Sequence, residues 1–376
     1  MKYDSKEKKG VYLTFQLVTA CDGVSKKVFA QKDALANLGF DTYIVYPTQI
    51  IDRTLTYEMN YRFFFDVHFG FMKSNYKDFY NKLYDFIKTN HITLLYVRYA
   101  INASPALIDF LLKCQKSDCT VLMEIPTYPY DGENRSFKEK ARAFKEHIYR
   151  NELSKCVDRI ITYSTLTTIF GIQTINISNA VAYIPPIVPK QEIKDRLNFI
   201  GVANLAFWHG FDRLIKGMYL YYQTLPSLKV YFTIVGVGNQ DVFHYLKELV
   251  TRYKLEEYII FEGAKDGTEL DDLFSKSHLA IGCLGCHRKG IKGLKSLKNV
   301  EYAMRGLPFI YSEDNEDFDN QDYVLKVSAD ESPIDINQLC EFIRNNDFIP
   351  SKLSETVSNF TWENQMRTII KSVGLL

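Results

Sequence analysis

The sequence predicts an α/β chain built from two doubly wound sheets. Strand-like apolar runs alternate with helix-like amphipathic runs along most of the chain, which is typical of parallel sheets covered by helices on both faces. A proline-rich segment, IPPIVPK at 184–190, interrupts the alternation, which then restarts. The length of 376 residues also suits two domains better than a single core.

In the first half, the elements follow from hydrophobic periodicity and helix-end signals. Short apolar runs predict strands at 11–15, 40–46, 92–98, 120–125 and 159–163. Helical spacing predicts helices at 24–38, at 75–90, from Ser104 onwards and at 134–153. Pro105 falls at the first helical position after Ser104, where a missing N–H is tolerated, and Gly39 ends the first helix.

In the second half, the same alternation predicts another sheet. Apolar runs predict strands at 198–202, 230–236, 259–261, 279–283 and 308–311. Amphipathic runs predict helices at 209–222, 240–253, 269–276, from Ser296 onwards and at 362–373. We therefore expect domains at 1–187 and 188–358, followed by a separate C-terminal helix at 359–376.

Charge and composition exclude several classes of protein. The 46 basic and 45 acidic residues leave a net charge of +1, which argues against nucleic-acid binding driven by bulk charge. The charged start and the absence of a long apolar run predict a cytoplasmic protein, in contact at most with the inner face of a membrane. The seven cysteines fit reduced, scattered thiols.

The sequence C-x-x-C-H at 283–287 matches a haem-attachment signature. Haem attachment requires export, and zinc would need a second recognisable pair of ligands, which the other cysteines do not supply. We therefore interpret Cys283 and Cys286 as buried small apolar residues and predict no metal and no cofactor.

A basic loop precedes the helix that is predicted to begin near Ser296. From Leu273 to Val300 there are six basic residues and no acidic one. A helix start directs unpaired N–H groups and a positive dipole end at this loop, and the loop glycines allow close approach of a ligand, so we expect a phosphate site. Glu301, one turn further on, is placed to accept hydrogen bonds from sugar hydroxyls. A solvated basic loop with no ligand is the alternative.

Loops that follow strands carry the other candidate residues, because ligands of open parallel sheets bind beyond the carboxyl ends of the strands. In the first half these residues are Asp22, Gly23, Arg98 and Glu124. In the second half they lie in the loops that start at Asn204, Gly236 and Gly263. For Glu124, capping of a turn is an equally acceptable interpretation, as is helix packing for His209 and an outward ion pair for Arg213.

Three stretches resemble the GT-B glycosyltransferases, in particular the retaining family 4: KNVEYAMRGLPFI at 298–310, DGVSKKVFAQKDALANLGFDTYIVYP at 22–47 and WHGFDRLIKGM at 208–218. The resemblance implies two Rossmann-like domains that face each other across a cleft. It also implies sugar transfer with retention from a nucleoside-diphosphate donor, which is a substrate and not a cofactor. The second domain would bind the donor, the first the acceptor, and the last helix would cross back to the first domain.

The motifs and the resemblance together assign roles to individual residues. The expected catalytic residues are Glu301, His209, Lys298 and Glu124. The expected donor-binding residues are Asn204, His209, Arg213, Gly236, Lys295, Ser296, Leu297, Lys298 and Glu301. The expected acceptor-binding residues are Asp22, Gly23, Arg98 and Glu124. The family commonly has a first glutamate where this chain has Gly293, so the donor sugar is not predicted from that position.

The expected acceptor is a glycan or a polyprenyl-linked glycan in polysaccharide synthesis of the bacterial type. The helix at 135–150 sets Phe144 and Ile148 on one face among basic residues, so it can lie on anionic lipid or pack on its own sheet. Two other functions remain open on sequence grounds. One is a nucleotide-sugar epimerase of the same fold, and the other is a silent partner subunit, which the absent first glutamate suggests.

Overall fold

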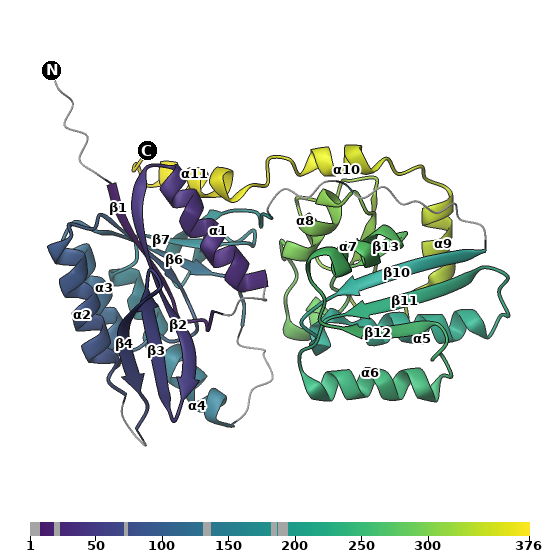
Figure 1. Cartoon of the computed structure of the whole chain (residues 1–376), viewed down its shortest axis with the longest axis horizontal. Helices are drawn as coiled ribbons and strands as arrows, with labels where there is room; N and C mark the ends of the chain where they lie inside the picture. The colour runs from purple at the N-terminus through teal and green to yellow at the C-terminus, as the bar shows by residue number, and fades with distance from the viewer. Residues whose placement is uncertain (1–7, 19–22, 71–73, 131–136, 182–185, 187–194) are drawn as a thin grey trace. The chain divides into compact units, whose positions relative to one another are not determined.

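The computed structural model of the chain describes residues 8–18, 23–70, 74–130, 137–181, 186 and 195–376. The chain divides into two compact units (Figure 1). Unit 1 is Met1–Ser178 with Trp362–Leu376, and unit 2 is Asn179–Thr361. The expected boundary between 187 and 188 lies outside the described residues. The C-terminal helix α11 (Trp362–Ser372) belongs to unit 1, where it packs against α1 (Gly23–Asn37).

Unit 1 contains a nine-stranded sheet in the order β4-β3-β2-β1-β5-β6-β7-β9-β8. Its strands are β1 (Lys8–Thr14), β2 (Phe40–Ile51), β3 (Thr54–Met59), β4 (Arg62–His68), β5 (Leu94–Arg98), β6 (Thr120–Ile125), β7 (Arg159–Thr162), β8 (Thr168–Ile169) and β9 (Ile172–Asn176). Its other helices are α2 (Tyr76–Thr89), α3 (Pro105–Gln115) and α4 (Phe137–Tyr149), the last continued by a 3₁₀ turn at Arg150–Lys155.

The predicted parallel sheet forms the centre of unit 1, and antiparallel strands that the sequence analysis did not predict extend it at both edges. Strands β2, β1, β5, β6, β7 and β9 pair in parallel. Strands β3 and β4 join β2 as antiparallel hairpins, and β8 pairs antiparallel with β9. The hairpin turns Asp52–Arg53 and Asn60–Tyr61 all have positive φ, which suits the right-handed twist of the strands that they connect.

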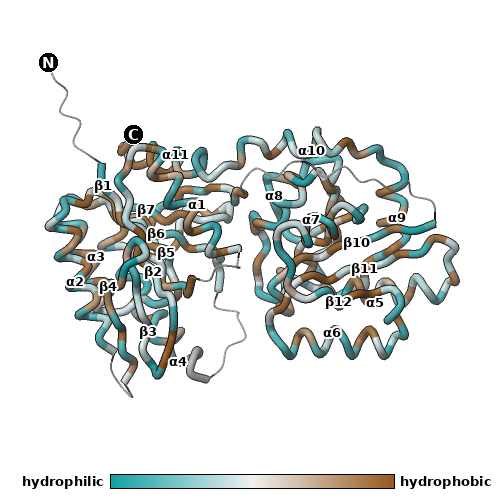
Figure 2. Tube along the Cα trace, viewed as in Figure 1, coloured by the Kyte–Doolittle hydropathy of each residue, from teal (hydrophilic) through white to brown (hydrophobic). Residues whose placement is uncertain are grey.

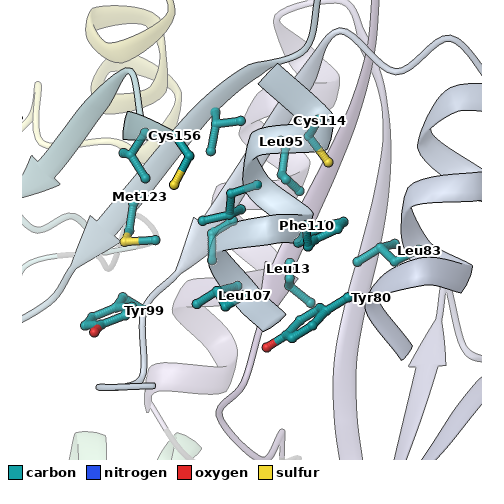
Figure 3. Close-up of a cluster of buried hydrophobic side chains, with 14 of the residues drawn as sticks. Leu13, Tyr80, Leu83, Leu95, Tyr99, Leu107, Phe110, Cys114, Met123 and Cys156 are labelled. Atoms are coloured by element: carbon teal, nitrogen blue, oxygen red, sulfur yellow. The ribbon is translucent and has the colours of Figure 1, made fainter. Parts of the chain in front are cut away.

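The core of unit 1 lies where α2 and α3 meet the central strands. Figure 3 shows Leu83 of α2, Phe110 of α3 and Leu95 of β5 among its buried side chains. Ser104 caps α3 by accepting a hydrogen bond from the Leu107 N–H at 3.4 Å, with Pro105 directly after it. This local geometry confirms the start of α3 that the sequence predicts.

Unit 2 contains a six-stranded parallel sheet in the order β12-β11-β10-β13-β14-β15. Its strands are β10 (Arg196–Val202), β11 (Lys229–Val235), β12 (Ile259–Gly263), β13 (Leu279–Ile281), β14 (Phe309–Tyr311) and β15 (Val324–Lys326). Its helices are α5 (Phe211–Tyr222), α6 (Gln240–Arg252), α7 (Gly267–Ser275), α8 (Leu297–Met304), α9 (Ile336–Arg344) and α10 (Pro350–Thr356). The sequence analysis did not predict β15, α9 or α10.

Helices cover both faces of this sheet. Leu197 and Phe199 of β10 face a core shared with α5, α6 and α9, whereas Ile200 faces a second core shared with α8. Helix α6 shows the amphipathic pattern in Figure 2, where hydrophobic and hydrophilic residues alternate along its trace. Unit 2 is therefore doubly wound, as predicted.

Candidate donor site

The strand order of unit 2 reverses at β10, and this reversal locates the candidate site. From β10 the chain proceeds to β11 and β12 on one side, and later to β13, β14 and β15 on the other. The loop after β10 leads to α5 on one face, and the loop after β13 leads to α8 on the other face. Loops that diverge in this way leave a crevice at the carboxyl ends of the strands, where open α/β sheets bind ligands.

Backbone hydrogen bonds tie these two loops together. Leu284 N–H donates to the His209 carbonyl at 3.0 Å, and Gly285 N–H donates to the Trp208 carbonyl at 3.1 Å. Gly210 has φ of +66°, and a Cβ at this position would lie 2.7 Å from the Leu284 carbonyl carbon. Only glycine permits this contact, so Gly210 allows the loops after β10 and β13 to lie against each other.

His209 lies in the loop after β10, where it is a buried, neutral hydrogen-bond donor. Its Nδ1 accepts a hydrogen bond from the Ala206 N–H at 3.1 Å, so the neutral ring carries its proton on Nε2. Burial lowers the pKa of His209 well below the usual range, and the nearby charge of Lys298 lowers it further. The histidine therefore offers a donor but adds no positive charge to the site at neutral pH.

This neutrality predicts how the stability of unit 2 depends on pH. The unfolded chain binds a proton on His209 below about pH 6.5, whereas the folded chain does not, so stability falls as the pH falls below that value. One such group contributes at most about 1.4 kcal/mol per pH unit. The measurement is urea unfolding of unit 2 between pH 7 and 5, followed by Trp208 fluorescence in a Trp362→Phe background.

We expect His209→Asn to flatten this dependence, because asparagine can accept the same Ala206 hydrogen bond and does not titrate. His244→Asn, on the exposed side of α6, is the matched control and should keep the wild-type slope. An unchanged slope in His209→Asn would show that His209 is not the group responsible.

Lys298 supplies the cation next to His209. It is the second residue of α8, and its Nζ atom is buried without a hydrogen-bond partner among the described residues. Lys295, in contrast, forms an ion pair with Asp317 at 3.0 Å, so part of its charge is neutralised within the protein. Of the two lysines that the sequence analysis placed at the phosphate, Lys298 is the better supported.

Helix α8 begins as predicted, with Ser296 at its N-cap and Leu297 as its first residue. The Ser296 side chain makes no capping bond to the helix. Both polar side-chain atoms of Asn299 are buried without a partner among the described residues. The start of α8 therefore presents polar groups that the described part of the protein does not use, as expected where a ligand or water binds.

Glu301 lies one turn further along α8. Arg305 donates to its Oε1 at 3.1 Å and in turn pairs with Asp271, while Oε2 has no hydrogen-bond partner among the described residues. The side chain is 24% exposed, which leaves it accessible from outside the helix. Arg305 thus orients a carboxylate that keeps one oxygen for an incoming hydroxyl.

The remaining donor residues differ in how they are placed. Asn204 is exposed in the loop after β10. Gly236 has φ of +121°, and a Cβ there would lie 1.9 Å from the Ala203 carbonyl oxygen, so the glycine is required by loop packing. Arg213 is fully buried and donates to the Leu284 and Ser332 carbonyls, so it would have to break these bonds to reach a phosphate. We leave Arg213 out of the proposed donor site.

Comparisons with known proteins place this geometry in a structural class. No family model matches the sequence, and no curated protein matches it. Solved structures match over nearly the whole chain. Sucrose-phosphate synthase from Thermosynechococcus elongatus has a TM-score of 0.68 at 14% identity, with 98% of this chain and 99% of that chain covered. HepE from Anabaena, in complex with UDP, has a TM-score of 0.64 at 13% identity, covering 98% and 100%.

The pneumococcal O-GlcNAc transferase GtfA, in complex with UDP and GlcNAc, has a TM-score of 0.63 at 13% identity, covering 98% of this chain and 99% of that chain. The chain has the GT-B fold. Its two units correspond to the two Rossmann-like domains of that fold. Identities this low establish the fold alone, so the reaction has to be argued from the residues.

In the N-terminal unit of this GT-B chain, the predicted acceptor residues Arg98 and Glu124 lie together in the interior. Glu124 is fully buried and accepts hydrogen bonds from Arg98, from Tyr96 at 2.7 Å and from Gln31 at 2.9 Å. Lys27 lies 3.4 Å from the same carboxylate. We therefore assign Glu124 and Arg98 to the folding of unit 1 and do not carry Glu124 into the proposed catalytic set.

The charges of this buried group shift one another. Burial alone would raise the pKa of Glu124, but Lys27 and Arg98 lower it to about 2. Burial lowers the pKa of Lys27 to about 7 against the attraction of Glu124. Of the other acceptor residues, Gly23 is the first residue of α1, and Asp22 lies outside the described residues.

Helix α4 carries the predicted membrane contact. Phe144 is 70% exposed and Ile148 is 56% exposed, so these two side chains do not pack on the sheet of unit 1. Lys140 and Lys145 are exposed as well. Arg150 was expected among the basic residues that surround this face, but it is buried beside Glu146 and Phe170. Among the described residues, no helix is long and apolar enough to cross a bilayer.

Sequence reasoning missed one polar residue at the site. Glu313 follows β14 and is 1% exposed, and neither of its carboxylate oxygens has a hydrogen-bond partner among the described residues. It lies beside Cys283 and Cys286. Sequence patterns of metal sites consist of paired Cys or His residues, and no local signal marks a single glutamate from the next loop.

Proposed function

We propose that the chain is a retaining glycosyltransferase that moves a sugar from a nucleoside-diphosphate donor to a glycan or lipid-linked glycan acceptor. The observation that carries this proposal is the buried Lys298 ammonium at the start of α8, which makes no hydrogen bond to the described residues and lies near the neutral donor His209. A cation, a helix start and an N–H donor at the switch point of a GT-B domain suit a diphosphate. Matched structures crystallised with UDP support this choice.

Each group would act on a different part of the donor. The dipole of α8 and Lys298 would stabilise the negative charge that develops on the departing diphosphate. His209 would donate from Nε2 to a phosphate or sugar oxygen, and the free Oε2 of Glu301 would accept hydrogen bonds from ribose or sugar hydroxyls. Such groups stabilise an oxocarbenium-like transition state because they are in place before the charge appears.

This arrangement predicts metal-independent transfer, with no cofactor. Because Lys298 and the helix start meet the diphosphate charge, we expect the rate to persist in EDTA without added Mg²⁺ or Mn²⁺. The measurement is the rate of nucleoside diphosphate release with and without chelator. Loss of activity that either of these two ions restores would contradict the prediction.

The acceptor is proposed from helix α4. Exposed Phe144 and Ile148 among lysines suit contact with an anionic lipid surface, where a polyprenyl-linked glycan would be held. We therefore propose a cytoplasmic enzyme that works at the inner face of a membrane in polysaccharide synthesis of the bacterial type. The free thiols of the six described cysteines fit a reducing compartment.

One assay tests the transferase against its two alternatives. The full chain is incubated with a panel of UDP, ADP and GDP sugars, and both nucleotide release and sugar composition are followed. A transferase releases nucleoside diphosphate from one donor, slowly to water and faster with acceptor. An epimerase would interconvert donors without release, and a silent partner subunit would do neither; each of these results would overturn the proposal.

A further inference from the structure

Three buried ligand-type side chains converge at the carboxyl end of the sheet in unit 2. Cys283 lies two residues after β13, Cys286 begins a short 3₁₀ helix at Cys286–Lys289, and Glu313 lies two residues after β14. The two sulfur atoms and one carboxylate oxygen all lie within 4.8 Å of one another. Their side chains are 4%, 1% and 1% exposed.

Apolar packing explains the cysteines but not the glutamate. Cys283 and Cys286 pack with Ile291 and Leu294, as small buried apolar residues do. Glu313 contributes a carboxylate to the same place, and neither of its oxygens finds a hydrogen-bond partner in the described part of the chain. The Lys298 ammonium is close enough to act on Glu313 electrostatically but makes no hydrogen bond to it. Both carboxylate oxygens therefore remain available to a metal ion, which would offset the cost of burying them.

We propose that Cys283, Cys286 and Glu313 bind a thiophilic divalent cation, with zinc as the best chemical match. Zinc–sulfur bonds of about 2.3 Å at tetrahedral angles put two thiolates about 3.8 Å apart, which lies within the 4.8 Å that encloses the three ligand atoms. Two thiolates select against hard ions such as Mg²⁺ and Ca²⁺. A fourth position is left for water or another donor.

The local charges are compatible with this site. Two thiolates and one carboxylate carry three negative charges, and a divalent cation leaves one of them uncompensated. The Lys298 ammonium lies beside Cys283 and Glu313 and can balance the remaining charge.

The ion would fasten two loops that already contact each other. Ser312 N–H donates to the Cys283 carbonyl at 2.9 Å, and Leu294 N–H donates to the Asp314 carbonyl at 3.0 Å. A metal bound across these loops would fix the segment between β13 and the loop after β14. Its role is structural and separate from the diphosphate chemistry, so this inference goes beyond the proposed function and does not depend on it.

The test uses the full chain, reduced and stripped of metal, titrated with Co²⁺ and then with Zn²⁺. We expect one equivalent of Co²⁺ to produce a thiolate charge-transfer band and the intense visible bands of tetrahedral cobalt, and one equivalent of Zn²⁺ to abolish them. Absence of both bands in folded, reduced protein would overturn the proposal. A Cys283–Cys286 disulfide in protein purified from a reducing cytoplasm, detected by mass after alkylation, would overturn it as well.

Variants identify the ligands. Cys286→Ser should remove most of the charge-transfer intensity. Glu313→Gln should keep the band but weaken Co²⁺ binding by more than about tenfold, because loss of a residue that only supports a metal ligand already costs about tenfold in affinity. Cys340→Ser is the matched control, because Cys340 is a buried cysteine of α9 outside the cluster. Equal cobalt affinity in all three variants would contradict the assignment of the ligands. If a variant fails to fold, the titration of the unmodified chain still tests the proposal.

Discussion

Replacing Glu124 by glutamine is expected to destabilise unit 1 by about 3–5 kcal/mol, the cost of removing one partner of a buried ion pair. The substitution leaves the Arg98 guanidinium buried without its counter-charge and replaces an acceptor of two further hydrogen bonds by an amide. Arg98 is 5% exposed, so water cannot replace the lost carboxylate without opening the unit.

The two tryptophans allow each unit to be followed separately. Trp362 belongs to unit 1 and lies 5.0 Å from Lys27, whereas Trp208 belongs to unit 2. Urea unfolding in a Trp208→Phe background therefore reports unit 1. Glu152→Gln, whose carboxylate is half-exposed and pairs with Lys155, is the control and should cost less than about 1 kcal/mol. Equal, small losses for both variants would refute the role given to Glu124.

The Glu124 carboxylate also makes the stability of unit 1 depend on pH in the acid range. The pKa of Glu124 is lowered to about 2 in the folded chain, so its ionised form contributes stability above about pH 4.5, the unfolded value. That contribution is lost as the pH falls from about 4.5 to 2. Glu124→Gln should therefore be less stable than the wild type at pH 7 and should lose less stability across this range.

Glu301→Gln is expected to weaken donor binding by about 1.5–3 kcal/mol, the range for a hydrogen bond to a charged group. The substitution keeps the shape of the side chain but removes the charge that Arg305 orients and that would accept from hydroxyls. The loss is measured by calorimetry with the intact nucleotide sugar, without acceptor, because this ligand carries both the ribose and the sugar hydroxyls. Glu341→Gln, on the exposed side of α9, is the control and should bind as the wild type does. Unchanged affinity in Glu301→Gln would remove Glu301 from the donor site.

The parts of the fold that the sequence predicts are those with strong local signals. Ser104 and Pro105 mark the start of α3, where the Ser104 side chain accepts a hydrogen bond from an N–H that the helix leaves unpaired. Ser296 marks the start of α8 by residue type and order, although its side chain makes no capping bond. The hairpins β2–β3 and β3–β4 were missed because their turns, Asp52–Arg53 and Asn60–Tyr61, lack the glycine that usually marks positive φ. Neither turn has a strong short-range signal.

Some features of the candidate site can likewise be predicted from the sequence, and others cannot. The basic loop and the helix start at Ser296 are visible in the sequence, because they depend on residue type and order. The neutrality of His209, the ion pair of Lys295 and the buried position of Glu124 depend on tertiary contacts, so no local pattern reveals them. Glu313 approaches Cys283 only because β13 and β14 are neighbours in the sheet.

The most direct test of the donor site is hydrogen exchange on the full chain with and without a saturating nucleoside diphosphate. The proposed site predicts slower exchange at 203–210 and 283–301, where the loops after β10 and β13 meet the start of α8. It predicts this protection in the presence of EDTA. Protection confined to unit 1, or no protection with UDP, ADP or GDP, would contradict the proposal that unit 2 binds the donor at this switch point.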